Sequence, residues 1–485
     1  EEELSEKLPG DVKQYIARHN VQFYIVDANR LARELGLGNH ANMILQAAFF
    51  KLSGVMPVED AVRHMKEAVQ KTYAKKGEKV VNMNMAAVDA GINSPVKVTV
   101  PADWANAADD RTVDETLPDV VKNIVVPCNR QRGDDLPVSA FLPYQDGTYP
   151  LGTSKYDKRG IAAFLPQWDS NKCLQCNQCT FVCPHAAIRP VLLTEEEKKS
   201  VPAGFETVPA KGLGKDSPYS FRMQVSPYDC LGCGVCLTAC PAEGALTMTS
   251  FEDMKAEQPL FDDVAMNESY LKKDVINDKS VKNVQFAKPY FQFSAACAGC
   301  AETTYIKLLS QLFGDRMYVG NAAGCSSAIS GGAPILPYCR DCKGHGPAWE
   351  HSLFEDNAEF AFGFYHAQDA IRKELLIRIE ALKNAGVAVE AAEAYLADWN
   401  DREKSREVSD KLIAALEAAE QTDEVKYILD NREFLAKKSV WAVGGDGWAY
   451  DIGFGGIDHV MAQNQDVNLL VLDTEVYSNT GGQSS

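Results

Sequence analysis

The feature that most constrains the fold of this chain is a cysteine run that occurs twice with the same spacing. Residues 173–184 and residues 230–241 each read C-x2-C-x2-C-x3-C-P. Runs with this spacing hold cubane iron–sulfur clusters in proteins, because three thiolates at two-residue gaps can surround one cluster. Two complete copies indicate an internal duplication, in which each half places its cluster beside the other.

The spacing also predicts that the two copies exchange ligands. The fourth cysteine of each run lies too far around the turn to reach the cluster of its own run, so it ligates the other cluster. We therefore expect two [4Fe-4S] clusters with four ligands each. The first would be held by Cys173, Cys176, Cys179 and Cys240, and the second by Cys183, Cys230, Cys233 and Cys236.

Zinc sites or a disulfide framework are the alternatives for so many cysteines. A zinc site needs only four ligands, with a longer gap between its two pairs, and disulfide frameworks are typical of small secreted chains. This chain has 485 residues, 14 Cys and a net charge of −18. A large acidic chain rich in cysteine favours a reducing compartment and metal ligation.

Charge and hydropathy exclude several classes of partner. The acidic balance argues against nucleic-acid binding, which requires a basic stripe. The acidic first residues are not a signal peptide, and no apolar run reaches the length of about 18 residues that a membrane span needs. We therefore expect a cytoplasmic protein that binds neither nucleic acid nor membrane.

The length predicts about three domains, and the fold class is expected to be α/β multidomain. Residues 1–108 read as the end of an α/β domain, with a helix near 12–19, a buried strand at 21–28 and a helix at 58–74. The expected order continues with a Pro-, Asp- and Gly-rich connecting segment (109–158), a two-cluster ferredoxin-like domain (159–270) and a second α/β domain with a helical insertion (271–485).

Three smaller features allow more than one interpretation. The stretch between the two cysteine runs predicts a loop or a helical insertion. His185 follows the first run and could donate a hydrogen bond to a cluster sulfur, but a surface histidine is the preferred interpretation. Cys339 and Cys342 could bind a metal, form a disulfide or do neither.

The Ala-, Leu-, Glu- and Lys-rich residues 366–435 predict a helical arm that covers the sheet.

A third group of cysteines stands outside the two runs. Residues 291–300 read as the end of a strand that leads into Cys297 and Cys300, and Cys325 follows a second predicted strand at 317–319. Three cysteines are one short of a cluster, so a redox-inactive pair and one unrelated thiol are the alternative. The small residues around them suit a cofactor that the backbone approaches closely.

Two predicted strands near the end of the chain each lead into a polar, Gly-rich loop. Residues 439–443 lead into Gly445-Asp446-Gly447, and residues 467–472 lead into residues 473–482. The carboxyl ends of neighbouring strands are where α/β sheets bind ligands. Asp446 offers a hard oxygen ligand to Mg2+, and the glycines let backbone N–H groups reach a phosphate. A single G-D-G is commonly only a turn, but the second loop at this spacing favours thiamine diphosphate.

Taken together, these motifs resemble the pyruvate:ferredoxin (flavodoxin) oxidoreductases, the single-chain 2-oxoacid:ferredoxin oxidoreductases. The resemblance rests on the paired cysteine runs and on residues 293–300, 324–327, 445–453 and 473–483. It implies oxidative decarboxylation of pyruvate with coenzyme A to acetyl-CoA and CO2. Electrons would pass through three [4Fe-4S] clusters to ferredoxin or flavodoxin, and the enzyme would be a homodimer whose last domain binds thiamine diphosphate.

The resemblance also implies roles for individual residues. Cys297, Cys300 and Cys325 would ligate a proximal cluster whose fourth cysteine lies beyond Ser485, and Asp446, Thr474 and the carbonyl of Val476 would hold Mg2+. Asn479 would face the substrate as a catalytic residue. Asn42 and Asn84 match coenzyme A contacts. The contacts to thiamine diphosphate would come from Glu302, Cys325, Gly445, Asp446, Gly447, Trp448, Thr474, Glu475, Val476, Tyr477, Ser478 and Asn479.

Some parts of the family's site have no counterpart in this sequence. The Glu that activates thiamine and the Arg and Thr that hold pyruvate lie in the family's N-terminal half, so we expect a segment that works with upstream and downstream parts and does not turn over alone. An electron-transfer subunit without its own catalysis is one alternative. The same chemistry on another 2-oxoacid is the other.

Overall fold

The structure is a computed structural model that describes residues 3–38, 40–108, 113–214, 217–272, 280–332, 334–478 and 481–484. The chain divides into two compact units, Glu1–Thr116 and Leu117–Ser485. Each unit has its own core and is described by itself. Within the described residues, no helix is both long enough and apolar enough to cross a membrane.

The first unit is built mainly from helices. They are α1 (Leu4–Lys7), α2 (Gly10–Arg18), α3 (Ala28–Glu34), α4 (Asn42–Ser53), α5 (Val58–Tyr73) and α6 (Glu78–Asn93). The predicted helix at 58–74 is confirmed as α5. Its Ala61, Met65 and Val69 recur every four residues, so they share one face and are buried.

The buried strand predicted at residues 21–28 is wrong in extent. Only Tyr24–Ile25 form a strand, β1, which pairs antiparallel with β2 (Val96–Lys97). Both strands lack further neighbours among the described residues. An apolar run becomes a buried strand only where its sheet is covered on both faces, and here residues 21–27 are all exposed or half-buried.

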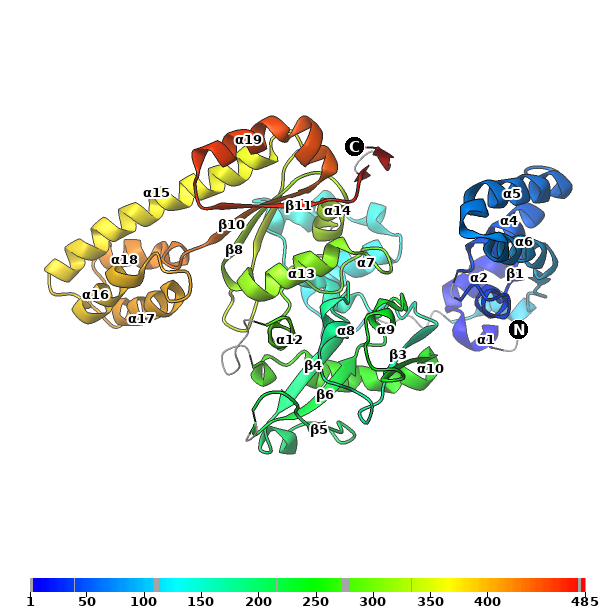
Figure 1. Ribbon diagram of the computed structural model, residues 1–485, viewed down its shortest axis with the longest axis horizontal. Coiled ribbons are helices and arrows are strands. Elements are labelled where there is room, and N and C mark those ends of the chain that lie inside the picture. The colour runs from blue at the N-terminus through cyan, green and yellow to red at the C-terminus, as the bar shows by residue number, and fades with distance from the viewer. Residues whose placement is uncertain are drawn as a thin grey trace. The chain divides into compact units, whose positions relative to one another are not determined.

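The cysteine runs lie in the second unit on short loops between two small antiparallel sheets (Figure 1). One sheet pairs β3 (Phe164–Trp168) with β7 (Leu246–Ser250), and the other has the order β4-β6-β5. Its strands are β4 (Ile188–Leu193), β5 (Val208–Pro209) and β6 (Ser220–Val225). The insertion between the runs therefore combines a small sheet, which the sequence did not predict, with the predicted loop, which lies between β4 and β6. Its apolar segments pair with each other, and Pro190 lies on the edge strand β4, where the missing N–H costs no ladder bond.

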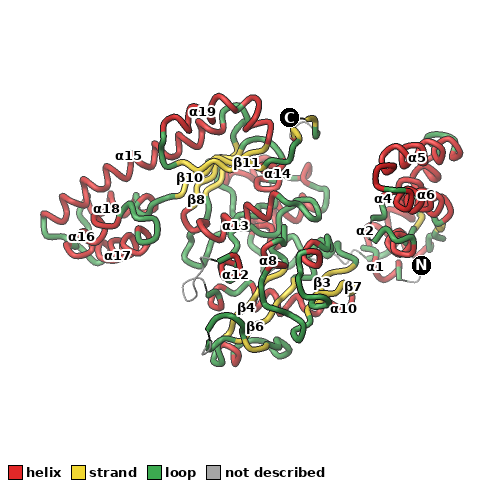
Figure 2. The backbone as a smooth tube through the Cα atoms, in the orientation of Figure 1, coloured by secondary structure: helices red, strands yellow, loops and turns green. Residues whose placement is uncertain are grey.

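A four-stranded parallel sheet forms the second half of this unit, with the order β11-β10-β8-β9 (Figure 2). The strands are β8 (Met317–Asn321), β9 (Ala348–His351), β10 (Ser439–Gly445) and β11 (Val467–Leu472). The predicted strands at 317–319, 439–443 and 467–472 are thus confirmed. The strand predicted at 291–300 is wrong, because Phe291 makes only an isolated bridge to Tyr338.

Helices cover both faces of the parallel sheet. Successive side chains of a strand point to opposite faces, so the apolar side chains of these strands need cover on both sides. Val440 and Ala442 of β10 pack with Ala358 of α15 (Asn357–Asn384) and with α19 (Phe454–Gln463). Met317 and Val319 of β8 pack on the other side against Ile306. Ile306 belongs to α13 (Glu302–Phe313), while α14 (Cys325–Gly331) follows β8.

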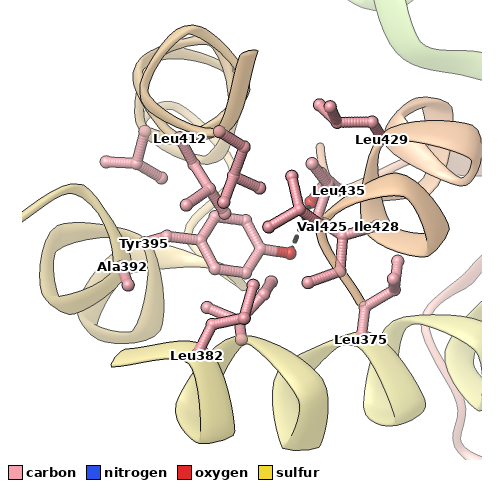
Figure 3. Close-up of a cluster of buried hydrophobic side chains, with 12 residues drawn as sticks. Leu375, Leu382, Ala392, Tyr395, Leu412, Val425, Ile428, Leu429 and Leu435 are labelled. Carbon is pink, nitrogen blue, oxygen red and sulfur yellow. Dashed lines mark hydrogen bonds between the residues drawn. The ribbon is translucent and has the colours of Figure 1, made fainter. Parts of the chain in front are cut away.

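The predicted helical insertion exists, but it extends away from the sheet instead of covering it (Figure 1). Only the first turns of α15 lie on the sheet. The rest of α15 packs with α16 (Val389–Asp398), α17 (Ser405–Glu417) and α18 (Asp423–Asp430). Leu375 and Ile379 face this separate core, which has the fully buried Tyr395 at its centre (Figure 3).

The remaining helices of the second unit are short. They are α7 (Val126–Asn129), α8 (Gln178–Phe181), α9 (Val235–Thr238), α10 (Phe251–Met254), α11 (Gln258–Leu260) and α12 (Val281–Val284). Two of them, α8 and α9, begin inside the cysteine runs and hold the third cysteine of each run.

Candidate cluster and cofactor sites

Two cavities in the second unit are lined by the cysteines of the two runs in the predicted groups. Cys183, Cys230, Cys233 and Cys236 line a cavity of about 20 Å³. Cys173, Cys176, Cys179 and Cys240 line another, also of about 20 Å³. In each case the fourth cysteine comes from the other run, so the structure brings together the ligand sets that the spacing predicts.

The two cysteine loops adopt the same backbone conformation. Gln175 and Asn177 have φ values of 57° and 61°, and Gly232 and Gly234, at the equivalent positions, have values of 66° and 77°. These left-handed turns point backbone N–H groups inward. The N–H of Gln175 lies 3.3 Å from Cys173 Sγ, and the N–H of Gly232 lies 3.4 Å from Cys230 Sγ. Hydrogen bonds to the sulfurs are among the interactions that set cluster potentials.

The chemistry of these thiols fits an iron–sulfur cluster. Burial raises the pKa of Cys179 and of Cys230 to about 12. Thiolates are the ligands that iron requires, so buried thiols of this kind ionise only when a metal supplies the positive charge. No three His, Cys, Asp or Glu side chains of the described chain are grouped closely enough for one metal ion; the cysteines instead surround two cavities.

The third cysteine set, which is Cys297, Cys300 and Cys325, lies beside the cavity that Cys233 lines. The charges of Cys300 and Cys297 act on Cys325, whose pKa is raised first by burial and then by Glu302. A Cβ atom at Gly299 would lie 3.7 Å from the Cβ atom of Cys233. The loop of Cys297 and Cys300 is therefore in van der Waals contact with the loop that lines the cavity of Cys233.

Asp446 is the centre of a second group, formed where β10 and β11 end. Its Oδ1 atom accepts hydrogen bonds from the backbone N–H of Thr474 at 2.9 Å and from the Thr474 hydroxyl at 3.1 Å. That hydroxyl also lies 3.3 Å from the carbonyl of Val476. The Oδ2 atom of Asp446 is buried and has no hydrogen-bond partner. The Asp446 carboxylate, the Thr474 hydroxyl and the Val476 carbonyl are hard oxygen ligands of the kind that Mg2+ prefers. The unpaired Oδ2 atom of Asp446 is available to such an ion.

The electrostatics of Asp446 suit a metal ligand. Burial by itself raises the pKa of the Asp446 carboxyl, but the hydrogen bonds from Thr474 outweigh burial and hold the pKa below its usual range. Glu302 lies near this carboxylate, since burial and then the charge of Asp446 raise the pKa of Glu302. The carboxylate at position 446 is therefore ionised at neutral pH, while its neighbour Glu302 is easier to protonate.

Three loops meet around Asp446 with little space between them. A Cβ atom at Gly447 would lie 2.4 Å from the ring of Tyr477, and one at Gly445 or at Gly324 would lie 3.6 Å from Ser478 Oγ. Backbone in such loops can approach a diphosphate closely. Trp448 is buried, whereas Glu475 is exposed and has a positive φ of 58°. The predicted catalytic residue Asn479 lies outside the described residues.

The two asparagines predicted to contact coenzyme A lie in the first unit. Asn42 is the exposed first residue of α4. Asn84 of α6 is buried, and its side-chain Nδ2 atom donates to the carbonyl of Val80 at 2.9 Å. α4 and α6 pack against each other, so both residues belong to one helical pair.

Two polar residues near the cavities were missed or misjudged by the sequence reasoning. The prediction of a surface His185 is wrong. It is 3% exposed, it lines the cavity of Cys183, and its Nε2 atom has no hydrogen-bond partner. Burial lowers the pKa of His185 to about 4. Lys307 was not predicted to have a role, but it is fully buried. Its position beside Ile306 in an apolar helix was the sequence signal that could have indicated this burial.

Cys339 and Cys342 are both thiols in the structure. Cys339 is buried and lies 3.7 Å from the carbonyl of Pro289, and the backbone N–H of Cys342 donates to Glu268 at 2.7 Å. Cys339 lines a cavity of about 750 Å³, between the connecting segment and residues 288–292. This cavity is larger than the cysteine-lined ones, but none of the predicted site residues lines it.

Family models match three segments of the chain. A family model described as pyruvate ferredoxin/flavodoxin oxidoreductase matches residues 1–94. A domain of unknown function matches residues 107–162, and a 4Fe-4S dicluster domain matches residues 172–244. The dicluster match contains both cysteine runs, which supports the 4Fe-4S character of the two cavities.

Curated relatives are similar over the whole chain. The chain is 49% identical to a pyruvate-flavodoxin oxidoreductase of Enterobacter agglomerans and 48% identical to a pyruvate:ferredoxin oxidoreductase of Moorella thermoacetica. Each match covers 100% of this chain and 42% of the relative. It is 45% identical to a mitochondrial pyruvate dehydrogenase (NADP+) of Euglena gracilis, of which it covers 27%. The chain thus spans less than half the length of these relatives. Over its whole length, it is homologous to part of the pyruvate-flavodoxin and pyruvate:ferredoxin oxidoreductases.

Proposed function

We propose that this chain is the electron-transferring and cofactor-holding part of an enzyme that oxidises pyruvate. The reaction converts pyruvate and coenzyme A to acetyl-CoA, CO2, one proton and two electrons. The bond between the carboxylate and the keto carbon breaks, and a bond from that carbon to the coenzyme A sulfur forms. Ferredoxin or flavodoxin takes the two electrons one at a time.

The observation that carries the proposal is the continuity of three cysteine sets with the Asp446 group. Glu302 follows Cys300 by two residues and lies near the Asp446 carboxylate. The loop of Cys300 in turn packs on the loop of Cys233. A cofactor at Asp446 would therefore have a cluster beside it, and that cluster would have the two ferredoxin-like clusters as its exit path.

Each residue of the Asp446 group has a task in this proposal. Asp446, Thr474 and the carbonyl of Val476 hold Mg2+, which binds the diphosphate. The glycines of the surrounding loops let their N–H groups reach the phosphate oxygens. Bound thiamine diphosphate would supply the electron sink that lets the carboxylate of pyruvate leave as CO2. Asn479 orients the substrate, and Asn42 and Asn84 contact coenzyme A.

The cysteines define the direction of electron flow. Cys297, Cys300 and Cys325 would hold the cluster nearest the Asp446 group, and Cys183, Cys230, Cys233 and Cys236 would hold the next one. The set with Cys173 is last and delivers electrons to the external carrier. We propose that the enzyme is a cytoplasmic homodimer in which other parts of the protein supply the remaining substrate contacts.

Anaerobic quantitation of iron, sulfide and thiamine in the protein purified from its source tests this function. We expect about twelve iron atoms and about one thiamine diphosphate per chain, because three cubane clusters hold four irons each. About eight irons without thiamine would instead support an electron-transfer protein without its own catalysis. The substrate is tested by measuring the coenzyme A-dependent reduction of flavodoxin with pyruvate and with other 2-oxoacids. We expect the fastest reduction with pyruvate.

A further inference from the structure

Lys307 on α13 is a buried cation that the proposed reaction does not yet use. It is 1% exposed. Its ammonium donates hydrogen bonds to the carbonyl of Thr180, to that of Phe181 at 2.9 Å and to that of Cys183 at 3.0 Å. No carboxylate of the described residues acts on its charge. Burying an ammonium without an anionic partner is costly, so this position calls for a compensating negative charge.

The carbonyls that Lys307 binds belong to the end of α8. The hydroxyl of Thr304, one turn earlier on α13, lies 3.3 Å from the carbonyl of Val182. Four consecutive carbonyls, from residue 180 to residue 183, therefore receive donors from one face of α13. The last carbonyls of a helix have no partner within the helix and carry its partial negative charge, which accounts for part of the attraction of a cation.

The position of Lys307 connects all three cysteine sets. α8 contains Cys179, which lines one cavity, and Cys183, which lines the other, follows the end of α8 by two residues. α13 begins at Glu302, directly after the loop of Cys300. Among the charges that act on the ammonium, negative charge on Cys183 attracts it most strongly, the guanidinium of Arg189 repels it, and charge on Cys179 attracts it less. The cation therefore contacts the backbone of Cys183 from the helix that follows the loop of Cys300.

We propose that Lys307 is a positioning residue for electron transfer whose buried charge raises the reduction potential of the cluster held by Cys183, Cys230, Cys233 and Cys236. A cluster with four thiolates is an anion, and one-electron reduction adds a further negative charge. A nearby cation in a low-dielectric interior stabilises that reduced state. The electron comes from the proximal cluster, which is oxidised as the second cluster is reduced. The inference rests on the proposed function only in requiring that these clusters are present.

The test is an anaerobic redox titration of the holoprotein, followed by electron paramagnetic resonance, for the wild type and for Lys307→Gln. The glutamine amide retains two N–H donors for the three carbonyls but carries no charge. We expect the equilibrium constant for reducing one cluster to fall at least tenfold, which is a downward shift of about 59 mV for one electron. The potentials of the other clusters should move less.

Thr304→Val is the matched control, since it removes a neutral donor to the same helix end and keeps the charge. It should leave the potentials unchanged. In the double variant Lys307→Gln/Thr304→Lys, a cation returns on the same face of α13 one turn earlier, and the potential should recover. If Lys307→Gln loses iron, Thr304→Lys alone decides the question: a raised potential supports the proposal.

Two results would overturn the inference. One is an unchanged potential in Lys307→Gln with the full iron content. The other is an equal shift in Thr304→Val, which would assign the effect to helix packing. A wild-type protein without clusters would contradict the proposed function instead, and the iron assay distinguishes that case from a failure of the inference.

Discussion

Asp446 illustrates how a single residue combines a structural and a chemical task. Its Oδ1 atom ties the loop after β11 to the loop after β10 through Thr474, while its Oδ2 atom remains buried without a partner. An unpaired buried carboxylate oxygen is costly in a protein that needs it only for structure. Its cost is offset if a cation occupies the position in front of it.

Replacement of Asp446 by Asn tests this interpretation. The amide keeps the shape and one acceptor but loses the charge, so we expect binding of thiamine diphosphate with Mg2+ to weaken by about ten- to a hundredfold, the range of a charged hydrogen bond. Titration of the holoprotein after removal of Mg2+ measures this affinity. Asp458→Asn, at an exposed position of α19, is the control. Equal affinities in wild type and Asp446→Asn would contradict the magnesium assignment.

The residues that sequence reasoning placed correctly are those whose local spacing carries the information. The cysteine spacing alone predicts which thiols line each cavity, and the continuous apolar runs of β10 and β11 predict the strands and the loops at their ends. The burial of His185 depends on the loop of Cys297, and the burial of Lys307 depends on the end of α8, and each of these partners is distant in sequence. A local pattern contains no information about such packing, so these residues were missed or placed on the surface.

At the scale of elements, the helical arm behaves as a body with its own core. Its apolar stripe on α15 faces α16, α17 and α18, and Tyr395 fills the centre (Figure 3). The Tyr395 hydroxyl donates to the carbonyl of Leu435 at 3.0 Å. The sequence predicted the helices but not their direction, because an apolar stripe does not reveal whether it covers a sheet or other helices.

Tyr395→Phe should destabilise the arm by about 1–3 kcal/mol, because the buried carbonyl of Leu435 loses its donor. Tyr395→Ala should cost about 3–5 kcal/mol by leaving a cavity. Hydrogen exchange in α16–α18 measures the effect, and iron content should stay unchanged. Ile377→Ala, where the side chain is 72% exposed, should stay within about 0.5 kcal/mol. A concerted loss of protection in the parallel sheet would contradict an independent arm core.

At the scale of the whole molecule, the second unit brings together cysteines that lie far apart in the chain. Each cavity takes three thiols from one run and one thiol from the other. The two small sheets make this exchange possible, because β3 pairs with β7 and β4 pairs with β6 across the insertion. Folding and cluster assembly are therefore coupled, since neither ligand set is complete until both runs are in place.

Serine substitutions in pairs test this exchange. Cys173 and Cys240 belong to one ligand set although they lie in different runs, so the double variant Cys173→Ser/Cys240→Ser should lose no more iron than Cys173→Ser alone. Cys230→Ser/Cys240→Ser removes ligands from both sets and should lose up to about eight irons, against about four for either single change. Cys342→Ser, which lies outside both cavities, should retain all its iron. Only interacting sites depart from additivity. If the iron losses of Cys173→Ser and Cys240→Ser added up, while those of Cys230→Ser and Cys240→Ser did not, each run would hold its own cluster. That result would overturn the exchange of ligands between the runs.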